Sequence, residues 1–447
     1  MMASEDIDSN LKEQPQSLGT AWYMVVLCMI AYLFSFVDRQ IVALLIEPIR
    51  ADLHISDTQF SLIHGLAFAI FYAVMGLPIA RLADTKSRPV IIAIGIAVWS
   101  IATAVCGTAK SFFQLFAARM AVGVGEAALS PAAYSMITDA FPKSKLGVAL
   151  GVYSMGSFLG AGLAYIIGGV AIEMVTKIGI VEMPIIGTVK PWQMTFFIVG
   201  LPGLLIAALF FLTVKDPERK GVVQGDSGYS IGEVFAYIGQ NKGSFTAHYV
   251  GFGLLALVLY ALMSWAPAFF LRNFELTTRE VGLYLGTLVL VCNVGGVLTS
   301  GWLIDFFTKR GRTDAALIAA IVGGVGALIP AALFPFMPNL TTTLIVLGVA
   351  LYFASFPMAT SAAALQWMAP NQMRAQVTAL FFLFMNLFGI TGGSSLVALS
   401  TDYLFKDEQL VGYSMAIVAC AAALIAVVLM ARGLAAFRKT VSDLQQA

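Results

Sequence analysis

The sequence predicts an all-α membrane protein with twelve transmembrane helices in two pseudo-symmetric bundles of six, and three observations lead to this fold class. Of the 447 residues, 59% are hydrophobic and only 11% are charged, whereas soluble globular proteins carry about 25% charged residues. Apolar runs long enough to cross a bilayer, about 20 residues each, recur along the whole chain. The two halves of the chain also share a short sequence pattern.

Each apolar run is expected to be a helix, because a backbone surrounded by lipid must satisfy its own hydrogen bonds. The predicted spans lie near 21–46, 57–82, 89–107, 111–138, 146–173, 192–214, 244–271, 278–304, 314–335, 340–368, 374–400 and 411–434. The predicted regions are an N-terminal tail, a first bundle, a linker, a second bundle and a C-terminal tail, at 1–20, 21–214, 215–243, 244–436 and 437–447.

Positive charge is distributed unevenly between alternate loops. Most of the 26 Lys and Arg residues fall on the side that also holds the N-terminal tail, the linker and the C-terminal tail. Because cytoplasmic loops are enriched in Lys and Arg, both termini are predicted to be cytoplasmic. The expected location is a cell membrane, of the bacterial inner-membrane type.

Charge balance and the spacing of possible ligands argue against several function classes. The formal charge of +1 gives no basic excess for a nucleic-acid partner. The four cysteines and three histidines show no metal-ligand spacing, and the chain has no nucleotide loop or nucleophile motif. We therefore expect no enzyme activity, no cofactor and no metal, and a monomer whose partners are the lipid bilayer, protons and a small substrate.

The chain repeats itself at a constant offset. Residues 55–62 align with 276–283, and the register continues through matched Gly and Asp residues. In both copies a hydroxyl residue is followed three positions later by Gln or Glu, which is a capping box that satisfies free amides at a helix start. Parallel repeats of six spans are a transporter architecture.

The loop between the second and third spans reads Gly76-Leu-Pro-Ile-Ala-Arg-Leu-Ala-Asp-Thr-Lys-Ser-Arg88. This string resembles the signature loop of the major facilitator superfamily. Asp84 and Arg88 match the pattern, whereas Ala80 stands where Gly is usual and Ser87 replaces a second Gly. A weaker copy, Gly301-Trp-Leu-Ile-Asp-Phe-Phe-Thr-Lys-Arg310, lies in the second half. The resemblance covers nearly the whole chain and implies the major facilitator fold.

Three further strings are informative: Phe36-Val-Asp-Arg-Gln-Ile41, Glu47-Pro-Ile-Arg-Ala-Asp-Leu53 and Arg119-Met-Ala-Val-Gly-Val-Gly-Glu-Ala127. Together they resemble the Spinster-type branch of that superfamily. This resemblance implies a proton-linked carrier for lysolipids or sphingolipid-like amphipaths.

Four ionisable residues lie inside predicted spans: Asp38, Arg39, Arg119 and Glu126. Burying such groups costs several kcal/mol unless each finds a partner or water. Asp38 lies roughly 24 Å from the start of span one, and Arg119 roughly 12 Å from the outer end of span four, so the two are expected at similar depth and able to face each other. Glu126 follows about two turns deeper on the same face as Arg119.

The positions of the second half that correspond to Asp38 and Arg39 hold uncharged residues. The fold therefore does not require these charges. Desolvation favours the protonated form of a carboxylate, and a neighbouring Arg favours its charged form. We therefore expect Glu126 and Asp38 to couple protons, and Arg119 and Arg39 to exchange a carboxylate for an anionic head group. A purely structural salt bridge is the alternative.

Two further groups of residues are candidates for function. Asp84 with Arg88, and the weaker pair Asp305 with Arg310, are expected to gate one side of the cavity by docking a loop carboxylate on a helix N-terminus or an Arg. The candidates for cavity contacts are Tyr153, Tyr260, Trp265 and Asn386.

The prediction is a carrier working by alternating access, and the residues leave its cargo open. A drug, an organic acid or a sugar is the alternative to an amphipathic anion. A channel or a membrane-embedded enzyme is the alternative from another class.

Overall fold

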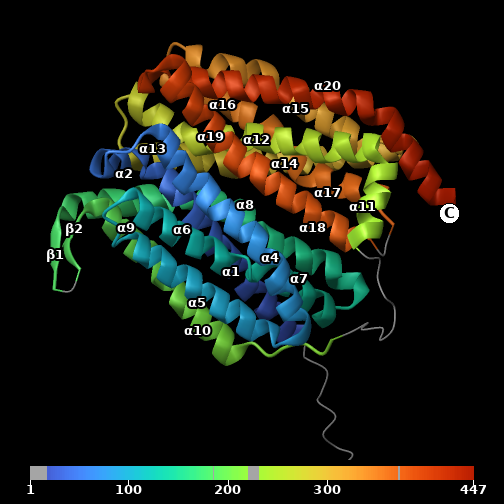
Figure 1. Cartoon of the computed structure of the whole chain (residues 1–447), viewed down its shortest axis with the longest axis horizontal. Coiled ribbons are helices and arrows are strands. Elements are labelled where there is room, and N and C mark those ends of the chain that lie inside the picture. Colours follow the sequence, from blue (N-terminus) through green and yellow to red (C-terminus); the bar gives the residue numbers. More distant parts are fainter. Residues whose placement is uncertain (1–17, 185, 220–230, 371–372, 447) are drawn as a thin grey trace, which may run out of the picture.

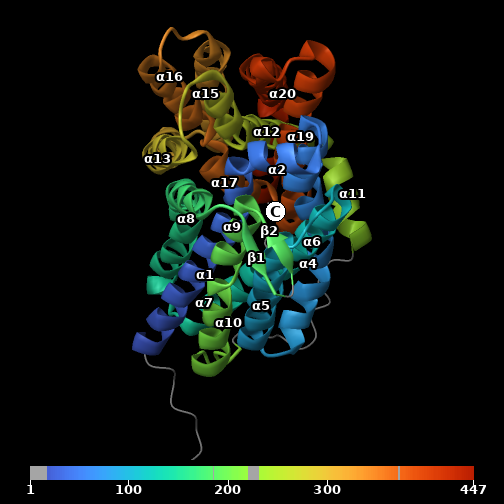
Figure 2. The ribbon, with the colours of Figure 1, turned by 90° about the vertical axis from the view of Figure 1, so that its left-hand side faces the viewer.

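The structure, a computed structural model, describes residues 18–184, 186–219, 231–370 and 373–446. Within these residues twelve helical segments are long and apolar enough to cross a membrane. The first six and the last six form two bundles that lie against each other (Figure 1, Figure 2). The predicted fold class is confirmed. Residues 1–17 of the predicted tail and 220–230 of the predicted linker lie outside the described residues.

The first bundle contains spans one to six. Its elements are α1 (Leu18–Leu44), α2 (Ile46–Leu53), α3 (Asp57–Ser61), η1 (Leu62–Leu66), α4 (Ala67–Thr85), α5 (Arg88–Cys106), α6 (Phe112–Glu126), α7 (Leu129–Ala140), α8 (Lys143–Ile178), β1 (Val181–Met183), β2 (Gly187–Val189), α9 (Pro191–Gly200) and α10 (Pro202–Thr213). The two strands pair antiparallel in a short hairpin between spans five and six. Span four is interrupted between α6 and α7, directly after Glu126.

The second bundle follows a short linker helix. The elements are α11 (Ile231–Gln240), α12 (Lys242–Asn273), α13 (Thr278–Leu288), η2 (Val289–Asn293), α14 (Val294–Thr308), α15 (Ala315–Leu333), η3 (Phe334–Phe336), α16 (Leu340–Ala354), α17 (Pro357–Met368), α18 (Arg374–Met385), η4 (Asn386–Gly392), α19 (Gly393–Leu399), η5 (Ser400–Phe405), η6 (Glu408–Leu410) and α20 (Val411–Gln446). Span ten is interrupted like span four, after Ala354, so only the first bundle has a carboxylate at this break.

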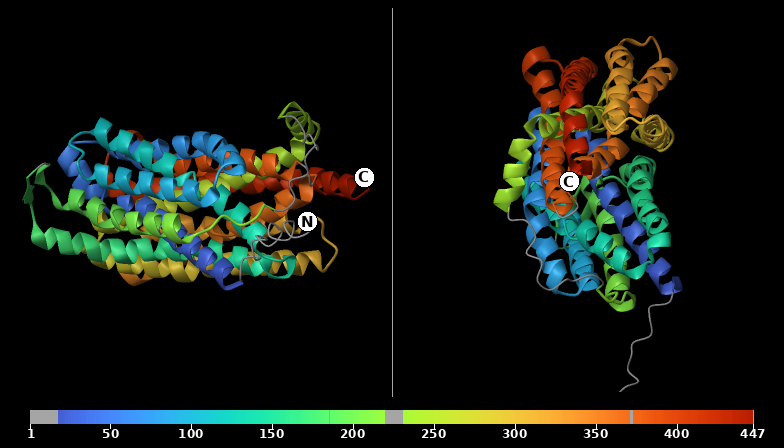
Figure 3. Two further views of the ribbon diagram at one scale, coloured as in Figure 1. Left: turned by 90° about the horizontal axis from the view of Figure 1, so that it is seen from below. Right: turned by 90° about the vertical axis from the view of Figure 1, so that its right-hand side faces the viewer.

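The two ends of the molecule carry different elements (Figure 1, Figure 3). We call one the linker end; it holds the start of α1, the linker helix α11 and the end of α20. We call the other the hairpin end; it holds α2 and the β1–β2 hairpin. The linker contains helix α11, which runs across the linker end rather than along the bundle (Figure 1). Helix α20 continues through the predicted C-terminal tail to Gln446.

The two predicted capping boxes are confirmed, and each starts the second span of its bundle. Ser56 and Gln59 exchange hydrogen bonds at the start of α3, and Thr277 and Glu280 do so at the start of α13. The shared device supports the origin of the halves as structural repeats.

The bundles pack closely where α8 meets α13. A Cβ atom at Gly282 would lie only 2.3 Å from the carbonyl oxygen of Tyr165, so a glycine is required at this crossing. Small residues allow helix backbones to approach in membranes, where burial of apolar surface does not drive association.

Candidate functional site

A buried ion pair joins the first and fourth spans. The Arg39 guanidinium donates from Nε to Glu126 Oε2 at 2.6 Å, and Arg39 Nη2 lies 2.6 Å from the same oxygen. Ser35 Oγ donates to Glu126 Oε2 at 2.9 Å. The other oxygen, Oε1, is buried and accepts no hydrogen bond from the described residues. One half of the carboxylate is thus held and the other is left without a partner.

The position of Glu126 follows from the glycines that precede it. A Cβ at Gly123 would lie 2.5 Å from the carbonyl oxygen of Phe68, and one at Gly125 would lie 2.6 Å from the amide nitrogen of Trp99. These glycines let α6 lie directly against the backbones of α4 and α5. The end of α6 therefore reaches the centre of the bundle and presents Glu126 to α1.

Aromatic rings surround the Arg39 guanidinium. Its Cζ atom lies 5.0 Å from the ring centre of Phe36, 4.6 Å from that of Phe68 and 5.0 Å from that of Tyr72. Cation–π contacts of this kind stabilise a charge that has lost water, by about 2 kcal/mol when desolvated. The rings therefore stabilise the Arg39 cation in addition to its carboxylate partner.

Asp38 and Arg119 are buried beside this pair, and only 3% and 1% of the surfaces of these two residues are exposed. Arg119 Nη1 donates to the main-chain oxygen of Asp38 at 3.4 Å. Within the described residues, Arg119 Nε and Asp38 Oδ1 have no hydrogen-bond partner, and no ion pair joins the two side chains. The structure brings the four predicted charges together, with Arg39 and Glu126 as the ion pair.

A small cavity of about 60 Å³ lies between the bundles, next to the charged cluster. Phe36, which packs under Arg39, forms part of its wall together with Gln40 from the same helix. Tyr260 and Asn293 line it from the second bundle. The remaining lining residues are Ser157, Ala161, Leu259, Met263, Val289, Val297, Ser355 and Met358.

The other predicted cavity residues have different surroundings. Tyr153 is hydrogen-bonded to Ser130 at 3.1 Å and stacks on Tyr32 within the first bundle. Trp265 Nε1 donates to the Ser394 carbonyl at 2.8 Å, which ties span seven to span eleven. Asn386 Nδ2 donates to a carbonyl of its own helix. Of the predicted cavity residues, only Tyr260 lines this cavity.

Sequence reasoning missed Asn293. Its side chain is 7% exposed, and its Oδ1 atom accepts no hydrogen bond from the described residues. It ends the π-helical turn η2, and such turns are frequent at functional sites. The sequence did hold a signal for Asn293, because an amide inside an apolar run needs a hydrogen-bonding partner. Asn386 was chosen as a candidate on the same ground.

A network of charged side chains crosses between the bundles at the hairpin end. We call it the hairpin-end lock. Arg272 contacts Glu47 Oε1 at 2.8 Å and both oxygens of Asp57 at 2.8 Å. Arg50 contacts Asp57 at 2.9 Å and Glu408 at 2.9 Å. Asp57 and Arg272 are almost completely buried, and their contacts join the first bundle to the second at this end.

Arg88 occupies a second charged network at the linker end, within the first bundle. Its guanidinium pairs with Asp139 of α7 and with Asp216 after α10, the latter at 2.7 Å. It also donates to Ser135 and to the Pro217 carbonyl. This places Arg88 in a joint between α5, α7 and the linker.

The remaining gating candidates are less connected. The side chain of Asp84 lies outside the described part of the structure. Asp305 and Arg310 are both exposed, and no ion pair links either one to another described residue. Arg310 lies over the ring of Phe306, with its Cζ 3.7 Å from the ring centre. Among the described residues, no group of three His, Cys, Asp or Glu side chains is placed to hold a metal ion.

Replacing Arg88 with Lys is expected to lower the free energy of unfolding by about 2 kcal/mol, because Lys keeps the charge but loses the planar fork that serves several acceptors. Thermal unfolding of the purified protein in detergent measures this change. The exposed variant Arg81→Lys is the control and should change stability by less than about 0.5 kcal/mol. Equal stability of the two variants would contradict the proposed joint.

Comparison with known proteins places this architecture in a family. The family model described as "Major Facilitator Superfamily" matches residues 28–394. The chain belongs to this superfamily. This major facilitator protein is therefore a multi-pass membrane transporter in family and fold, rather than an enzyme. The expectation drawn from the signature loop is confirmed.

Individual relatives agree with this assignment. An "MFS-type efflux pump" of Mycolicibacterium smegmatis is 27% identical over 434 residues, which cover 95% of each chain. "Protein spinster" of Drosophila melanogaster is 26% identical over 311 residues, 67% of this chain and 48% of that one. The crystal structure of a bacterial homologue of the human lysosomal transporter Spinster, described as inward-facing and unoccupied, matches with a TM-score of 0.75 at 24% identity, covering 96% of this chain and 98% of that chain. The resemblance to Spinster-type proteins is confirmed.

Proposed function

We propose that this transporter is a proton-coupled secondary carrier that moves an amphipathic anion, such as a lysophospholipid or sphingolipid-like molecule, by alternating access. The observation that carries the proposal is the buried Arg39–Glu126 pair beside the cavity between the bundles. A titratable acid and a cation able to bind an anion lie next to a cavity between the bundles. This cavity, of about 60 Å³, would have to widen as the bundles move apart to admit the cargo. Ionisable groups inside membrane spans typically mark substrate or proton pathways.

The mechanism is a competition for Arg39. An anionic head group entering the cavity binds the Arg39 fork and displaces Glu126, and the displaced carboxylate is then stable in its dry site only as the protonated acid. Cargo and proton therefore bind together. Release of the proton on the other side restores the carboxylate, which recovers Arg39 and expels the cargo. Asp38 and Arg119 provide a second acid and a second cation next to this exchange.

The lining of the cavity favours cargo with an apolar tail. Its wall in the second bundle is built largely from Leu259, Met263, Val289, Val297 and Met358. Polar side chains also line both sides of the cavity, Gln40 and Ser157 in the first bundle and Asn293 and Ser355 in the second, so a sugar is an alternative cargo. An organic acid or a drug is a further alternative, since Arg39 would bind any carboxylate.

Alternating access needs an element that closes one end, and the hairpin-end lock is placed to do so. It holds the bundles together at the hairpin end through Arg272 and Asp57, so we propose that cargo exchanges at the linker end in this state. The distribution of Lys and Arg supports a cytoplasmic linker end with both termini inside the cell. The proposed location is a cell membrane. On the linker side, Arg88 with Asp84 is the proposed gate. In this conformation Arg88 pairs with Asp139 and Asp216 within the first bundle and the start of the linker, as expected for a gate that is open at this end.

Uptake into proteoliposomes tests this function. Labelled lysophosphatidylglycerol should accumulate in vesicles carrying the protein only when a pH gradient is imposed, and it should be recovered chemically unchanged. Galacturonate and a cationic drug serve as alternative cargoes in parallel vesicles. Gradient-independent equilibration would indicate a channel, a converted product would indicate an enzyme, and accumulation of galacturonate alone would reassign the cargo.

Replacing Asn293 with Leu is expected to weaken cargo binding about tenfold, the effect of losing one hydrogen bond worth about 1.4 kcal/mol. The unpartnered Oδ1 atom is available to accept from the cargo head group. The KM for lysophosphatidylglycerol uptake measures the loss, and coupling to the pH gradient should persist. Cys292→Ala, on the same π-helical turn, is the control. An unchanged KM in the Asn293 variant would remove this residue from the cargo site.

A further inference from the structure

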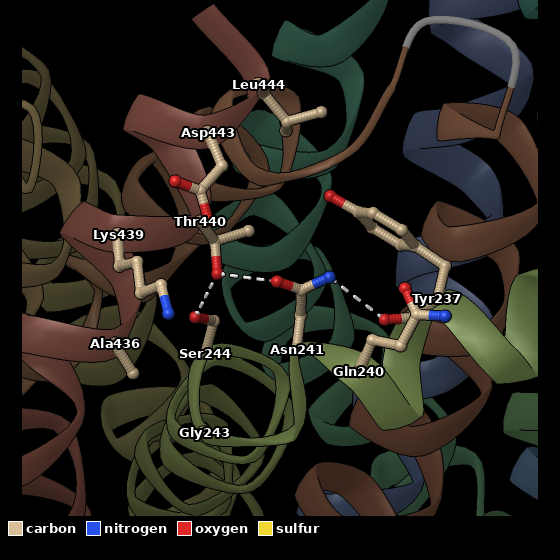
Figure 4. A pocket seen from close by; sticks show the side chains of 10 residues that line it. All are labelled: Tyr237, Gln240, Asn241, Gly243, Ser244, Ala436, Lys439, Thr440, Asp443 and Leu444. Atoms are coloured by element: carbon tan, nitrogen blue, oxygen red, sulfur yellow. Dashed lines mark hydrogen bonds between the residues drawn. The ribbon is translucent and has the colours of Figure 1, made fainter. Parts of the chain in front are cut away.

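We propose that the pocket between α11, α12 and α20 binds the head group of an aminophospholipid of the adjacent membrane leaflet. The pocket, whose lining side chains are drawn in Figure 4, has a volume of about 420 Å³. It lies at the linker end and shares no lining residue with the cavity between the bundles. Its lining is mainly polar: amide, hydroxyl and phenol groups together with one cation and one anion. The pocket is separate from the cargo cavity. Of the proposed function, this inference depends only on the orientation of the protein in the membrane.

The floor of the pocket is organised by a chain of hydrogen bonds. Thr440 Oγ1 donates to Asn241 Oδ1 at 3.0 Å, so its single proton is used there. The 2.7 Å contact between Thr440 and Ser244 therefore has the Ser244 hydroxyl as donor. Asn241 Nδ2 donates in turn to the Tyr237 carbonyl at 3.1 Å. These bonds tie the linker helix to α12 and α20 before any ligand arrives.

Lys439 and Asp443 give the pocket two opposite charges at its rim. They lie four residues apart on α20, about 6 Å along the helix axis, on either side of Thr440 (Figure 4). Both are exposed, and no ion pair joins either one to a described residue. These two charges match a ligand that carries a phosphate and an ammonium group a short distance apart. The Lys439 ammonium would pair with the phosphate, and the Asp443 carboxylate with the ammonium group of the ligand.

Tyr237 closes the opposite side of the pocket from α11 (Figure 4). Its hydroxyl donates to the Met368 carbonyl at 2.8 Å, which fixes the ring. Burial, and secondarily the nearby Asp443 carboxylate, raise the pKa of Tyr237 to about 12, so the phenol stays neutral at working pH. The ring is therefore a fixed, uncharged wall facing Asp443.

The surroundings place the pocket at the level of lipid head groups. Helix α11 runs across the linker end, with Val234 buried against the protein and Phe235 56% exposed (Figure 1). A helix with an outward aromatic residue in this orientation is typical of the membrane interface. Helix α12 enters its apolar stretch directly after Lys242 and Ser244. A phospholipid beside α11 can therefore place its head group in the pocket while its acyl chains stay in the bilayer.

The two charges distinguish between head groups. Lys439 suits the phosphate of any phospholipid. Asp443 accepts hydrogen bonds, which the ammonium of ethanolamine donates and the trimethylated ammonium of choline does not. A purely anionic head group would meet repulsion from Asp443. Phosphatidylethanolamine fulfils both requirements.

Native mass spectrometry of the full-length protein in detergent tests the site. We expect diacyl phosphatidylethanolamine to bind at least tenfold more tightly than phosphatidylcholine or phosphatidylglycerol. Asp443→Asn should remove this preference, and Lys439→Gln should weaken the binding of all three lipids. Lys309→Gln and Glu218→Gln, which change exposed charges outside the pocket, should leave both the preference and the affinities unchanged. Unfolding temperatures measured without added lipid confirm that all four variants are folded.

Three results would overturn the proposal. They are equal binding of phosphatidylcholine, stronger binding of phosphatidylglycerol, or a preference that survives Asp443→Asn. Soluble phosphoethanolamine is a further arm, since binding as tight as that of the lipid would identify a soluble ligand instead. Cargo uptake by the pocket variants separates this proposal from the proposed function, because failure of lipid binding with normal uptake affects only the pocket.

Discussion

Replacing Glu126 with Gln is expected to lower uptake driven by a pH gradient about 100-fold, the typical loss on removing a positioned proton-transfer group. Gln cannot take up or release a proton, so cargo binding at Arg39 is no longer coupled to protonation of the side chain at position 126. Cargo binding itself should persist, because an amide competes weakly for the Arg39 fork. Uptake of lysophosphatidylglycerol with and without the gradient, together with counterflow at equal pH, separates the two steps.

The control for this variant is Glu275→Gln, which makes the same chemical change at an exposed position of the hairpin end. It should leave both uptake and counterflow unchanged. If the Glu126 variant still accumulated cargo in response to the gradient, Glu126 would not be the coupling acid. If it lost binding as well, the Arg39–Glu126 pair would be a structural bridge whose removal disrupts the site.

Replacing Arg272 with Gln is expected to open the hairpin-end lock. The change leaves Glu47 and the buried Asp57 with fewer partners, and removing one member of a buried pair typically costs about 3–5 kcal/mol. That cost falls on the conformation in which the lock is closed, so the population should shift towards one open at the hairpin end. Spin labels at Ala51→Cys and Glu275→Cys report the shift as a longer distance across this end.

A matched control lies on the same face of the molecule. Arg279 also reaches across the bundles, to Glu173 at 3.3 Å, but its side chain is 52% exposed. An exposed pair contributes only about 0–1 kcal/mol, so Arg279→Gln should leave the distance distribution nearly unchanged. Identical distributions for the two variants would show that the lock does not hold this end closed.

The fold could be predicted from the sequence because its signals are local. Apolar runs give the spans, and the capping boxes at Ser56 and Thr277 mark equivalent helix starts in both halves. The cost of burying charge in lipid is enough to single out the four residues of the central cluster. These signals require no knowledge of how the helices are rotated about their axes.

The pairing within the cluster depends on that rotation. The rise of a helix gives depth, which was enough to place Asp38 next to Arg119, as the contact from Arg119 Nη1 to the Asp38 carbonyl shows. Depth could not show that the ion pair is made by Arg39 and Glu126. Asp38 and Arg39 are adjacent and point in different directions, and the structure turns Arg39 towards the end of α6, where Gly123 and Gly125 bring Glu126 close.

Contacts between distant parts of the chain could not be predicted in the same way. The hairpin-end lock joins α2 to the end of α12, and its members carry no distinctive spacing in the sequence. Asn293 lies in a π-helical turn, which shifts the faces of a helix relative to a regular repeat. An apolar run gives no sign of such a turn.

Proton exchange during cargo binding tests the competition for Arg39 most directly. Lysophosphatidylglycerol is added to the purified protein in weakly buffered detergent solution that contains a pH-sensitive dye. The competition predicts that protons are taken up as cargo binds, that affinity therefore rises as pH falls, and that Glu126→Gln abolishes the uptake while binding continues. Cargo binding without proton uptake, or equal uptake by wild type and Glu126→Gln, would contradict it.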